Sequence, residues 1–221
     1  MVRTAFVAKR RAKRRVPEAR PEPRVRLDSD ERRTQLVALG LEHFGSRAYD
    51  DVSIDEIASA AGISKGLLYH YFPTKRAFYA ATVREAAASL VASCDTDESA
   101  PSLARLHAGL DAYLSYVRAH AKAYATLMRS GVGVDPEIAR IVDETRATFV
   151  TRLTSGFDTS PILESPMVRL ALRGWVGFAE AASLGWSETI AAGESAPSQE
   201  QVCTLLATTL LEIVRSAASG G

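Results

Sequence analysis

Apolar residues recur at helical spacing along almost the whole chain after residue 27, and no stretch alternates strictly enough to predict a strand. In the first segment, Leu36, Leu39 and Phe44 point to the core from a helix that begins near Asp28 and ends at Gly45. Capping residues and breakers separate the later segments in the same way. The pattern therefore predicts an all-α protein of about nine helices, at residues 28–45, 54–61, 65–71, 75–94, 102–119, 122–130, 136–154, 166–186 and 199–217.

Two of these predicted helices are short and meet at a glycine corner. Ser53 and Glu56 have the spacing of a capping box at the start of the first helix, and Ser64 can cap the second. Gly62 can adopt the left-handed conformation that ends a helix. Two short helices joined in this way form a helix-turn-helix pattern, in which the second helix enters the major groove of DNA. A generic helical pair has the same spacing, so spacing alone leaves both alternatives open.

The residues of this segment decide between them. The stretch from Val52 to Lys75 reads VSIDEIASAAGISKGLLYHYFPTK. It closely resembles the signature of tetracycline-repressor (TetR) family transcriptional regulators, T-x-x-x-I-A-x-x-A-G-V-S-x-G-x-L-Y-x-H/Y-F-x-x-K. The resemblance is strong over residues 31–78, and the rest of the chain matches in being an acidic, helical segment of the expected length. It implies an N-terminal three-helix DNA-binding domain at residues 28–81 and a larger helical effector-binding and dimerisation domain at residues 82–221.

The same resemblance implies which residues contact DNA. Ser53, Tyr69 and Lys75 correspond to phosphate contacts, which a hydroxyl donor and a lysine charge can make. The exposed face of the second short helix would read base edges, with Lys65 reaching guanine acceptors and Leu67 a thymine methyl. Tyr69 can alternatively pack into the small core. The full expected DNA-binding set is Ser53, Ser64, Lys65, Gly66, Leu67, Tyr69, His70, Tyr71 and Lys75.

Charge divides the chain into two unlike parts. Residues 1–27 hold 10 Lys and Arg against 2 Glu, a net charge of +8, whereas the remainder has a net charge of −7. The basic run KRRAKRR is followed by three prolines and few large apolar residues, which is typical of disorder. Because residues 28–81 alone have a net charge of −2, we interpret residues 1–27 as a disordered basic arm that follows DNA phosphates. A solubilising tail or an over-long start is the alternative.

The predicted helix at residues 166–186 is apolar almost all round, so the core of one subunit cannot easily cover it. Small residues on it allow another helix to approach closely, and the last helix carries an apolar stripe. We expect these two helices, at about residues 166–186 and 199–217, to form a homodimer interface of the four-helix kind that the family uses. A large monomeric helical domain is the alternative. The residues concerned are Gly174, Gly177, Ala181, Ala182 and Gly185 on the first helix, and Val202, Leu206, Leu210, Ile213 and Val214 on the second.

Large, partly apolar residues also lie on the helices that line the effector cavity in this family. Aromatic walls with a few polar tips suit a hydrophobic small molecule, although each such residue can equally be ordinary core. No ligand identity follows from the sequence. The candidates are Tyr113, Tyr116, Tyr124, Met128, Trp175 and Phe178.

Several functional classes find no support in the sequence. Cys94 and Cys203 are too few for a disulfide framework or a zinc site and fit a reducing cytoplasm, and no apolar run is long enough to predict a membrane span or signal peptide. Enzyme motifs such as G-x-S-x-G, H-E-x-x-H and the P-loop are missing, so no enzyme, cofactor or metal is expected. We expect a cytoplasmic repressor that leaves a pseudo-palindromic double-stranded DNA operator when a small hydrophobic effector binds. The alternative is a small-molecule-binding or enzymatic helical protein whose basic arm binds polyanions non-specifically.

Overall fold

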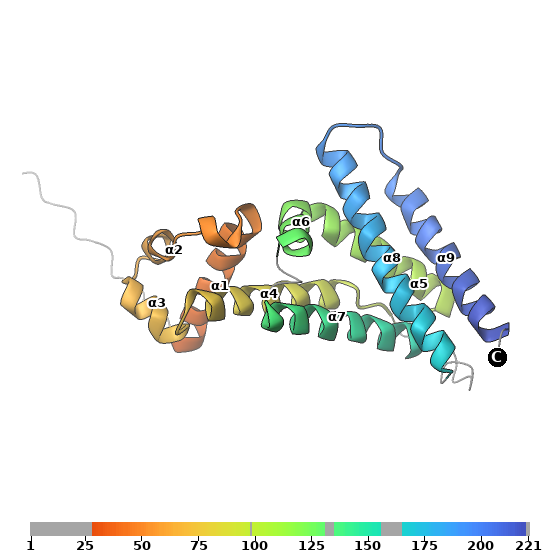
Figure 1. Cartoon of the computed structure of the whole chain (residues 1–221), viewed down its shortest axis with the longest axis horizontal. Helices are drawn as coiled ribbons and strands as arrows, with labels where there is room; N and C mark the ends of the chain where they lie inside the picture. The colour runs from red at the N-terminus through yellow and green to blue at the C-terminus, as the bar shows by residue number, and fades with distance from the viewer. Residues whose placement is uncertain (1–27, 98, 131–134, 156–164, 220–221) are drawn as a thin grey trace, which may run out of the picture.

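The computed structural model describes residues 28–97, 99–130, 135–155 and 165–219, and in these ranges the regular structure is entirely helical (Figure 1). The all-α prediction is confirmed. The predicted basic arm and the predicted breakers at residues 131–133 and 156 lie outside the described residues. The elements are α1 (Ser29–Ser46), a 3₁₀ turn η1 (Tyr49–Asp51), α2 (Ile54–Ala60), α3 (Lys65–Tyr71), α4 (Lys75–Ser93), α5 (Ser102–Ala119), α6 (Ala121–Ser130), α7 (Pro136–Ser155), α8 (Pro166–Ala191) and α9 (Gln199–Ser219).

Most helix boundaries agree with the sequence prediction to within two residues, but α8 does not. It continues to Ala191, whereas the pattern predicts an end at Trp186. The helix ends where Gly193 adopts a φ of +71°. A glycine stops a helix only where the backbone needs the left-handed conformation.

The helices α1, α2 and α3 pack with the start of α4 around a small core that forms one end of the molecule (Figure 1). Asp28 begins α1 with a complete capping box, since its carboxylate accepts from the Glu31 N–H at 2.8 Å and Glu31 accepts from the Asp28 N–H at 3.0 Å. The fully buried side chains of this core are Leu36, Ile57, Leu68 and Phe78.

The corner between α2 and α3 forms as the sequence predicts. Gly62 has a φ of +66°, and the Ile63 N–H reaches back to the Ala58 carbonyl at 3.0 Å, which closes the end of α2. The predicted capping box at Ser53 forms only in part. The Ser53 hydroxyl accepts from the Glu56 N–H at 3.5 Å, but the Glu56 carboxylate accepts from Arg47 at 2.7 Å instead of turning back to Ser53.

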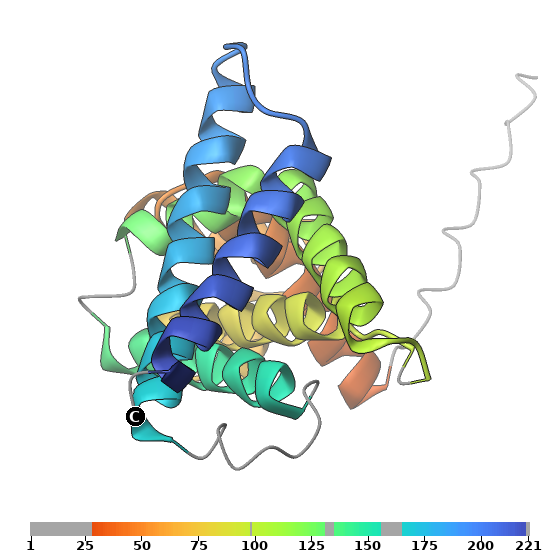
Figure 2. The ribbon, with the colours of Figure 1, turned by 90° about the vertical axis from the view of Figure 1, so that its right-hand side faces the viewer.

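The remaining helices build a larger core in which α8 and α9 lie side by side against α5 (Figure 2). The Trp175 indole of α8 donates to the Leu206 carbonyl and the Thr209 hydroxyl of α9, both at 3.2 Å. By length and composition α9 could cross a membrane, a test that core helices of soluble proteins also pass. Three of its residues, Val202, Leu206 and Leu210, are nevertheless buried in this core.

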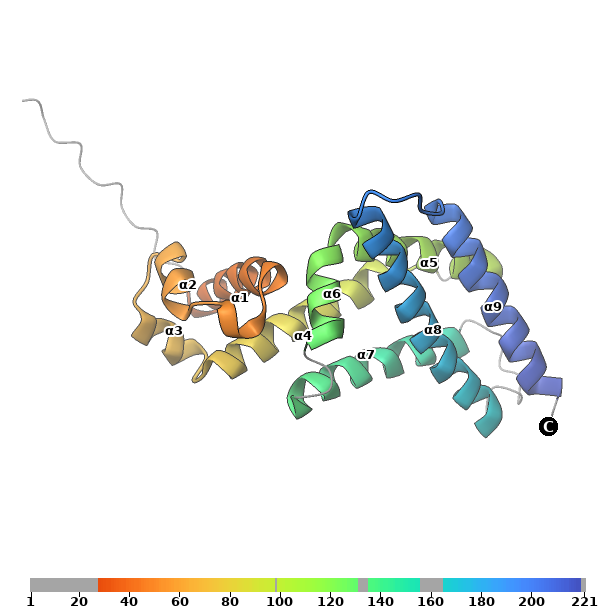
Figure 3. The same cartoon turned by 45° about the horizontal axis from the view of Figure 1, so that its top comes forward.

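Helix α4 belongs to both ends of the molecule and connects them (Figure 3). Its Phe78 lies in the small core and its Leu90 in the large one. At Gly40, α1 approaches α4 so closely that an added Cβ would overlap Thr82 and lie 2.8 Å from Phe78 Cζ. The start of α4 is also clamped to α7, because Arg76 Nε lies 2.7 Å from the Asp135 carboxylate. The start of α7 is therefore in direct contact with the base of the helix-turn-helix.

Candidate DNA-binding surface and ligand cavity

Helix α3 has one buried face and one exposed face. Ser64 caps the helix by accepting from the Leu67 N–H at 3.2 Å, and Leu68 anchors it in the small core. The opposite face is exposed, and it holds the residues predicted to read bases: Lys65, Gly66, Leu67 and His70. The structure therefore brings these side chains to one surface that a DNA groove can reach.

The residues expected to contact phosphates lie beside this face and are partly buried. Tyr69 and Tyr71 pack at the margin of the small core, so they combine a structural contact with a partly exposed ring. Ser53 is half-buried at the start of α2. Lys75 Nζ donates to the Asp50 carbonyl at 3.3 Å and lies 4.6 Å from the centre of the Tyr49 ring. Its ammonium group is thus held at the edge of the surface.

Lys65 is paired within the protein, which sequence reasoning missed. Its Nζ lies 2.8 Å from the Asp55 carboxylate of α2, and this hydrogen bond, together with the charge of Asp55, raises the pKa of Lys65. The two residues are ten positions apart, so only the corner at Gly62 brings them together. A base or phosphate that takes Lys65 must displace Asp55.

A cavity of about 1010 Å³ lies among α4 to α8 and extends to α1. This is at the upper end of the range of about 300–1,000 Å³ that ligand pockets occupy. Five of the six predicted effector contacts line it: Tyr113, Tyr116, Tyr124, Met128 and Trp175. The prediction that Phe178 lies in the cavity needs correction. It does not line the cavity but lies 39% exposed on the outer face of α8, because the buried face of that helix runs through Leu172, Trp175 and Ala179 and leaves it outside.

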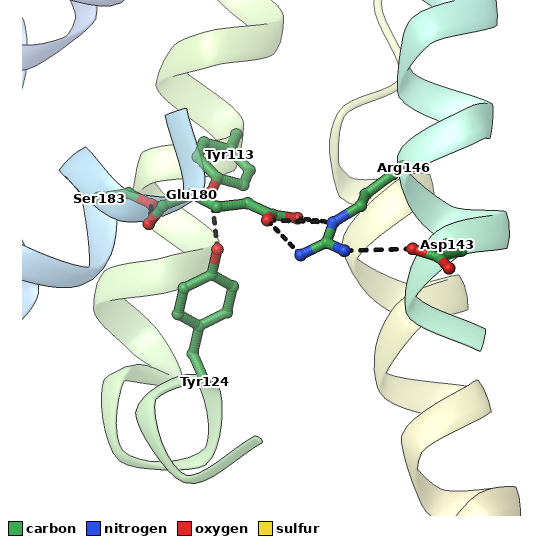
Figure 4. Close-up of polar contacts among 6 residues, drawn as sticks. All are labelled: Tyr113, Tyr124, Asp143, Arg146, Glu180 and Ser183. Carbon is green, nitrogen blue, oxygen red and sulfur yellow. Dashed lines mark hydrogen bonds and ion pairs between the residues drawn. The ribbon is translucent and has the colours of Figure 1, made fainter. Parts of the chain in front are cut away.

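A chain of hydroxyl groups crosses the cavity wall (Figure 4). The Tyr113 hydroxyl lies 2.9 Å from that of Tyr124 and 2.8 Å from that of Ser183, which donates to the Glu180 carbonyl. Burial, reinforced by Tyr124, raises the pKa of Tyr113 well above its usual value, and burial also raises the pKa of Tyr124. These hydroxyls form hydrogen bonds to one another and to a backbone carbonyl, so they are uncharged hydrogen-bonding groups rather than activated nucleophiles.

The Glu180 carboxylate beside them is neutralised by Arg146 of α7 (Figure 4). The guanidinium donates to Glu180 through Nε at 3.0 Å and through a terminal nitrogen at 2.7 Å, and it also lies 3.1 Å from Asp143. Neither Glu180 nor Ser183 stood out in the sequence, because their partners lie on other helices. Within the residues described, no group of three His, Cys, Asp or Glu side chains is placed to hold a metal ion.

An uncharged face of α8 remains exposed. Its glycines at 174, 177 and 185 have open space around an added Cβ. Large apolar side chains flank them, namely Met167, Leu170 and Phe178 on α8, with Leu205 exposed on α9, whereas the exposed Leu211 lines the cavity. We call Met167, Leu170, Phe178 and Leu205 the outer apolar face. The predicted apolar stripe of α9 needs correction, because Val202, Leu206 and Leu210 are buried in their own subunit and Ile213 and Val214 pack against the same core.

Comparison with known proteins agrees with this arrangement. The family model for bacterial regulatory proteins of the tetR family matches residues 36–82, and that for the tetracyclin repressor-like C-terminal domain matches residues 103–211. A crystal structure of a tetR-family transcriptional regulator from Streptomyces coelicolor has 31% identity and a TM-score of 0.77, over 88% of this chain and 85% of that one. The chain belongs to the TetR family of transcriptional regulators.

Curated relatives of this TetR-family protein match over shorter segments. The HTH-type transcriptional activator FasR of Mycolicibacterium smegmatis is 30% identical over 116 residues, which is 52% of this chain and 53% of FasR. The transcriptional regulator AcuR of Cereibacter sphaeroides is 41% identical over 59 residues, or 27% of each chain. The chain thus spans about half or less of the curated relatives that it matches.

Proposed function

We propose that this protein is a homodimeric repressor that binds a pseudo-palindromic operator and releases it when a small hydrophobic effector fills the cavity. The observation that carries the proposal is the extent of that cavity. Its wall includes Tyr113 and Trp175 of the large core together with Leu41 and Phe44 of α1. A ligand there contacts the element that supports the helix-turn-helix, so it can favour one arrangement of the two ends over another.

In this proposal residues 28–81 bind DNA, residues 82–221 hold the effector and the dimer interface, and residues 1–27 add non-specific affinity. Lys65, Gly66, Leu67 and His70 read base edges from the exposed face of α3, which the exposure of all four supports. The phosphate contacts come from the remaining residues of the surface: Ser53, Ser64, Tyr69, Tyr71 and Lys75. The site of action is the cytoplasm, where the operator lies.

The dimer forms through the outer apolar face of α8 and α9. Apolar side chains gathered on one face of a soluble protein mark an interaction surface. The open glycines of α8 support close approach of a second helix, and Figure 2 shows α8 and α9 as the outermost layer on that side. A two-fold dimer places two α3 helices one DNA turn apart, about 34–36 Å, as paired half-sites require.

Release is a linkage effect. Effector binds more tightly to a conformation in which α4 has moved and the two α3 helices no longer match the groove spacing. The clamp between Arg76 and Asp135 and the ion pair between Arg146 and Glu180 support this route, since α7 is tied to α4 at its start and to the cavity wall at its middle. Moving the equilibrium from mostly bound to mostly released takes a preference of about 5 kcal/mol.

Activation of transcription is the second candidate, because the matched relative FasR is named a transcriptional activator. A reporter gene under the selected operator distinguishes the two signs. We expect expression of this protein to lower reporter output when the operator overlaps the promoter. A rise in output would show an activator.

A gel shift with random duplex DNA at low and moderate salt tests DNA binding itself. We expect a salt-sensitive complex with the full chain, and a weaker complex that persists when residues 2–26 are deleted, because the helix-turn-helix contacts phosphates on its own. Loss of all binding on deletion would instead support a helical small-molecule-binding protein or enzyme whose basic arm alone attracts polyanions.

A further inference from the structure

The charged groups at the cavity wall are not equally paired. Glu180 is neutralised by Arg146, and Asp95 accepts from Arg152 at 2.6 Å. Arg105 of α5 also lines the cavity, yet among the described residues no ion pair is found for it. Once the acids of the wall are paired, Arg105 is the charged wall residue without an ion pair to another described residue; the exposed Asp97 outside the wall feels its charge without lying at ion-pair distance.

The Nε–H of Arg105 is moreover buried without a hydrogen-bond partner. Leaving such a donor unpaired is unfavourable, and native proteins normally satisfy it with a protein group, a water or a ligand. The pKa of Asp97 lies below its usual value, mainly because Ser99 donates hydrogen bonds to it and further because of the positive charge of Arg105. The charge of Arg105 therefore acts on its neighbours. The position therefore suits an anionic acceptor.

The rest of the cavity is elongated and mostly apolar. Arg105, near the start of α5, and His120, directly after its end, both line it and are fifteen positions apart, which corresponds to about 22 Å at 1.5 Å per residue. The end opposite Arg105 is formed by Leu41, Phe44 and Tyr79. A ligand that fills this space has a long apolar body, and its charged group needs an oppositely charged side chain such as Arg105 beside it.

We propose that the effector is an elongated amphipathic anion, with a carboxylate or phosphate head at Arg105 and an apolar tail directed toward Leu41 and Phe44. This inference rests on the proposed ligand-released regulator and names the chemistry of its ligand. The tail contacts the small core while the head is held at the far end. Binding of the head to a guanidinium also gives a charge-assisted hydrogen bond, which is stronger than a neutral one.

Binding of matched probes to the purified full-length protein tests the proposal. Intrinsic tryptophan fluorescence, to which the cavity residue Trp175 and the more distant Trp186 contribute, reports titrations with lauric acid, dodecyl phosphate, 1-dodecanol and dodecyltrimethylammonium below their micelle-forming concentrations. We expect the anions to bind about tenfold to a hundredfold more tightly than the alcohol, the range that a hydrogen bond to a charged group provides. The two anions distinguish a carboxylic acid from a phosphate ester as the natural head.

The variant Arg105→Met removes the charge and keeps an apolar side chain. We expect its affinity for lauric acid to fall to that for 1-dodecanol, while its affinity for the alcohol stays unchanged and shows that the cavity is intact. Two matched variants should keep the preference for the acid: Arg118→Met, on the exposed face of the same helix, and His120→Leu, at the other end of the cavity.

Three results would overturn the inference: equal binding of the acid and the alcohol, tighter binding of the ammonium probe, or loss of alcohol and acid binding alike in Arg105→Met. The gel shift on the same samples separates this from failure of the proposed function. A DNA complex without acid preference refutes the ligand class alone, whereas absence of any DNA complex refutes the regulator whatever the probes do.

Discussion

Truncation of Leu170 on the outer apolar face should weaken the dimer. Its side chain is 66% exposed in the single chain, so a partner subunit can still cover about two-thirds of it. Full burial of a leucine is worth about 1.5–3 kcal/mol, and Leu170→Ala therefore removes about 1 kcal/mol per copy. A two-fold interface contains the residue twice, so the dissociation constant of the dimer should rise about thirtyfold.

Sedimentation equilibrium over a range of protein concentrations measures this constant directly. Leu103→Ala is the matched control, because Leu103 is also an exposed leucine, 55% accessible, but lies near the start of α5, where it lines the cavity. We expect it to leave the dimer unchanged. An unaltered constant for Leu170→Ala, or equal weakening by both variants, would refute the assignment of this face as the interface.

Three further predictions concern DNA binding and stability. The double variant Tyr69→Phe with Lys75→Ala should weaken binding to all duplexes alike, whereas Lys65→Ala should relax the preference at one base position. Competition assays with single-base variants of the selected site compare the two. A sequence-selective loss of binding in the double variant would contradict the phosphate-contact role of Tyr69 and Lys75. Deleting residues 2–26 should reduce the slope of log affinity against log salt concentration by about 0.9 for each phosphate that the arm neutralises. An unchanged slope in a salt titration would show that the arm does not contact DNA phosphates. Gly40→Ala should lower the free energy of unfolding by about 1–3 kcal/mol in chemical denaturation, since its Cβ would overlap Thr82, while Gly66→Ala, which meets only Ser64 Oγ at 3.9 Å, should not.

Local signals in the sequence predicted most of the helix boundaries. Gly62 ends α2 in the left-handed conformation, Pro166 begins α8, and Ser198 and Gln201 have the spacing of a capping box and form one, with bonds of 2.8 and 3.2 Å. The end of α8 lies beyond the predicted Trp186, because the helix continues to Ala191 and stops only where Gly193 takes the left-handed conformation.

The candidate site was only partly predictable, because burial and pairing are decided between helices. Helix α9 is apolar on more than one side, so the sequence cannot say that Val202 and Leu206 face their own core while Leu205 faces outward. The pair of Arg146 and Glu180 joins residues 34 positions apart, and only the packing of α7 on α8 brings them together. Polar pairs between different helices leave no periodic pattern in the sequence.

Selection of bound duplexes from a random DNA pool, followed by sequencing, tests the central claim most directly. The purified full-length protein should enrich an inverted repeat whose half-sites lie about one helical turn apart, since two α3 helices related by a two-fold axis read them together. Enrichment of no sequence at all, or of a single half-site without its repeat, would contradict a dimeric sequence-reading regulator.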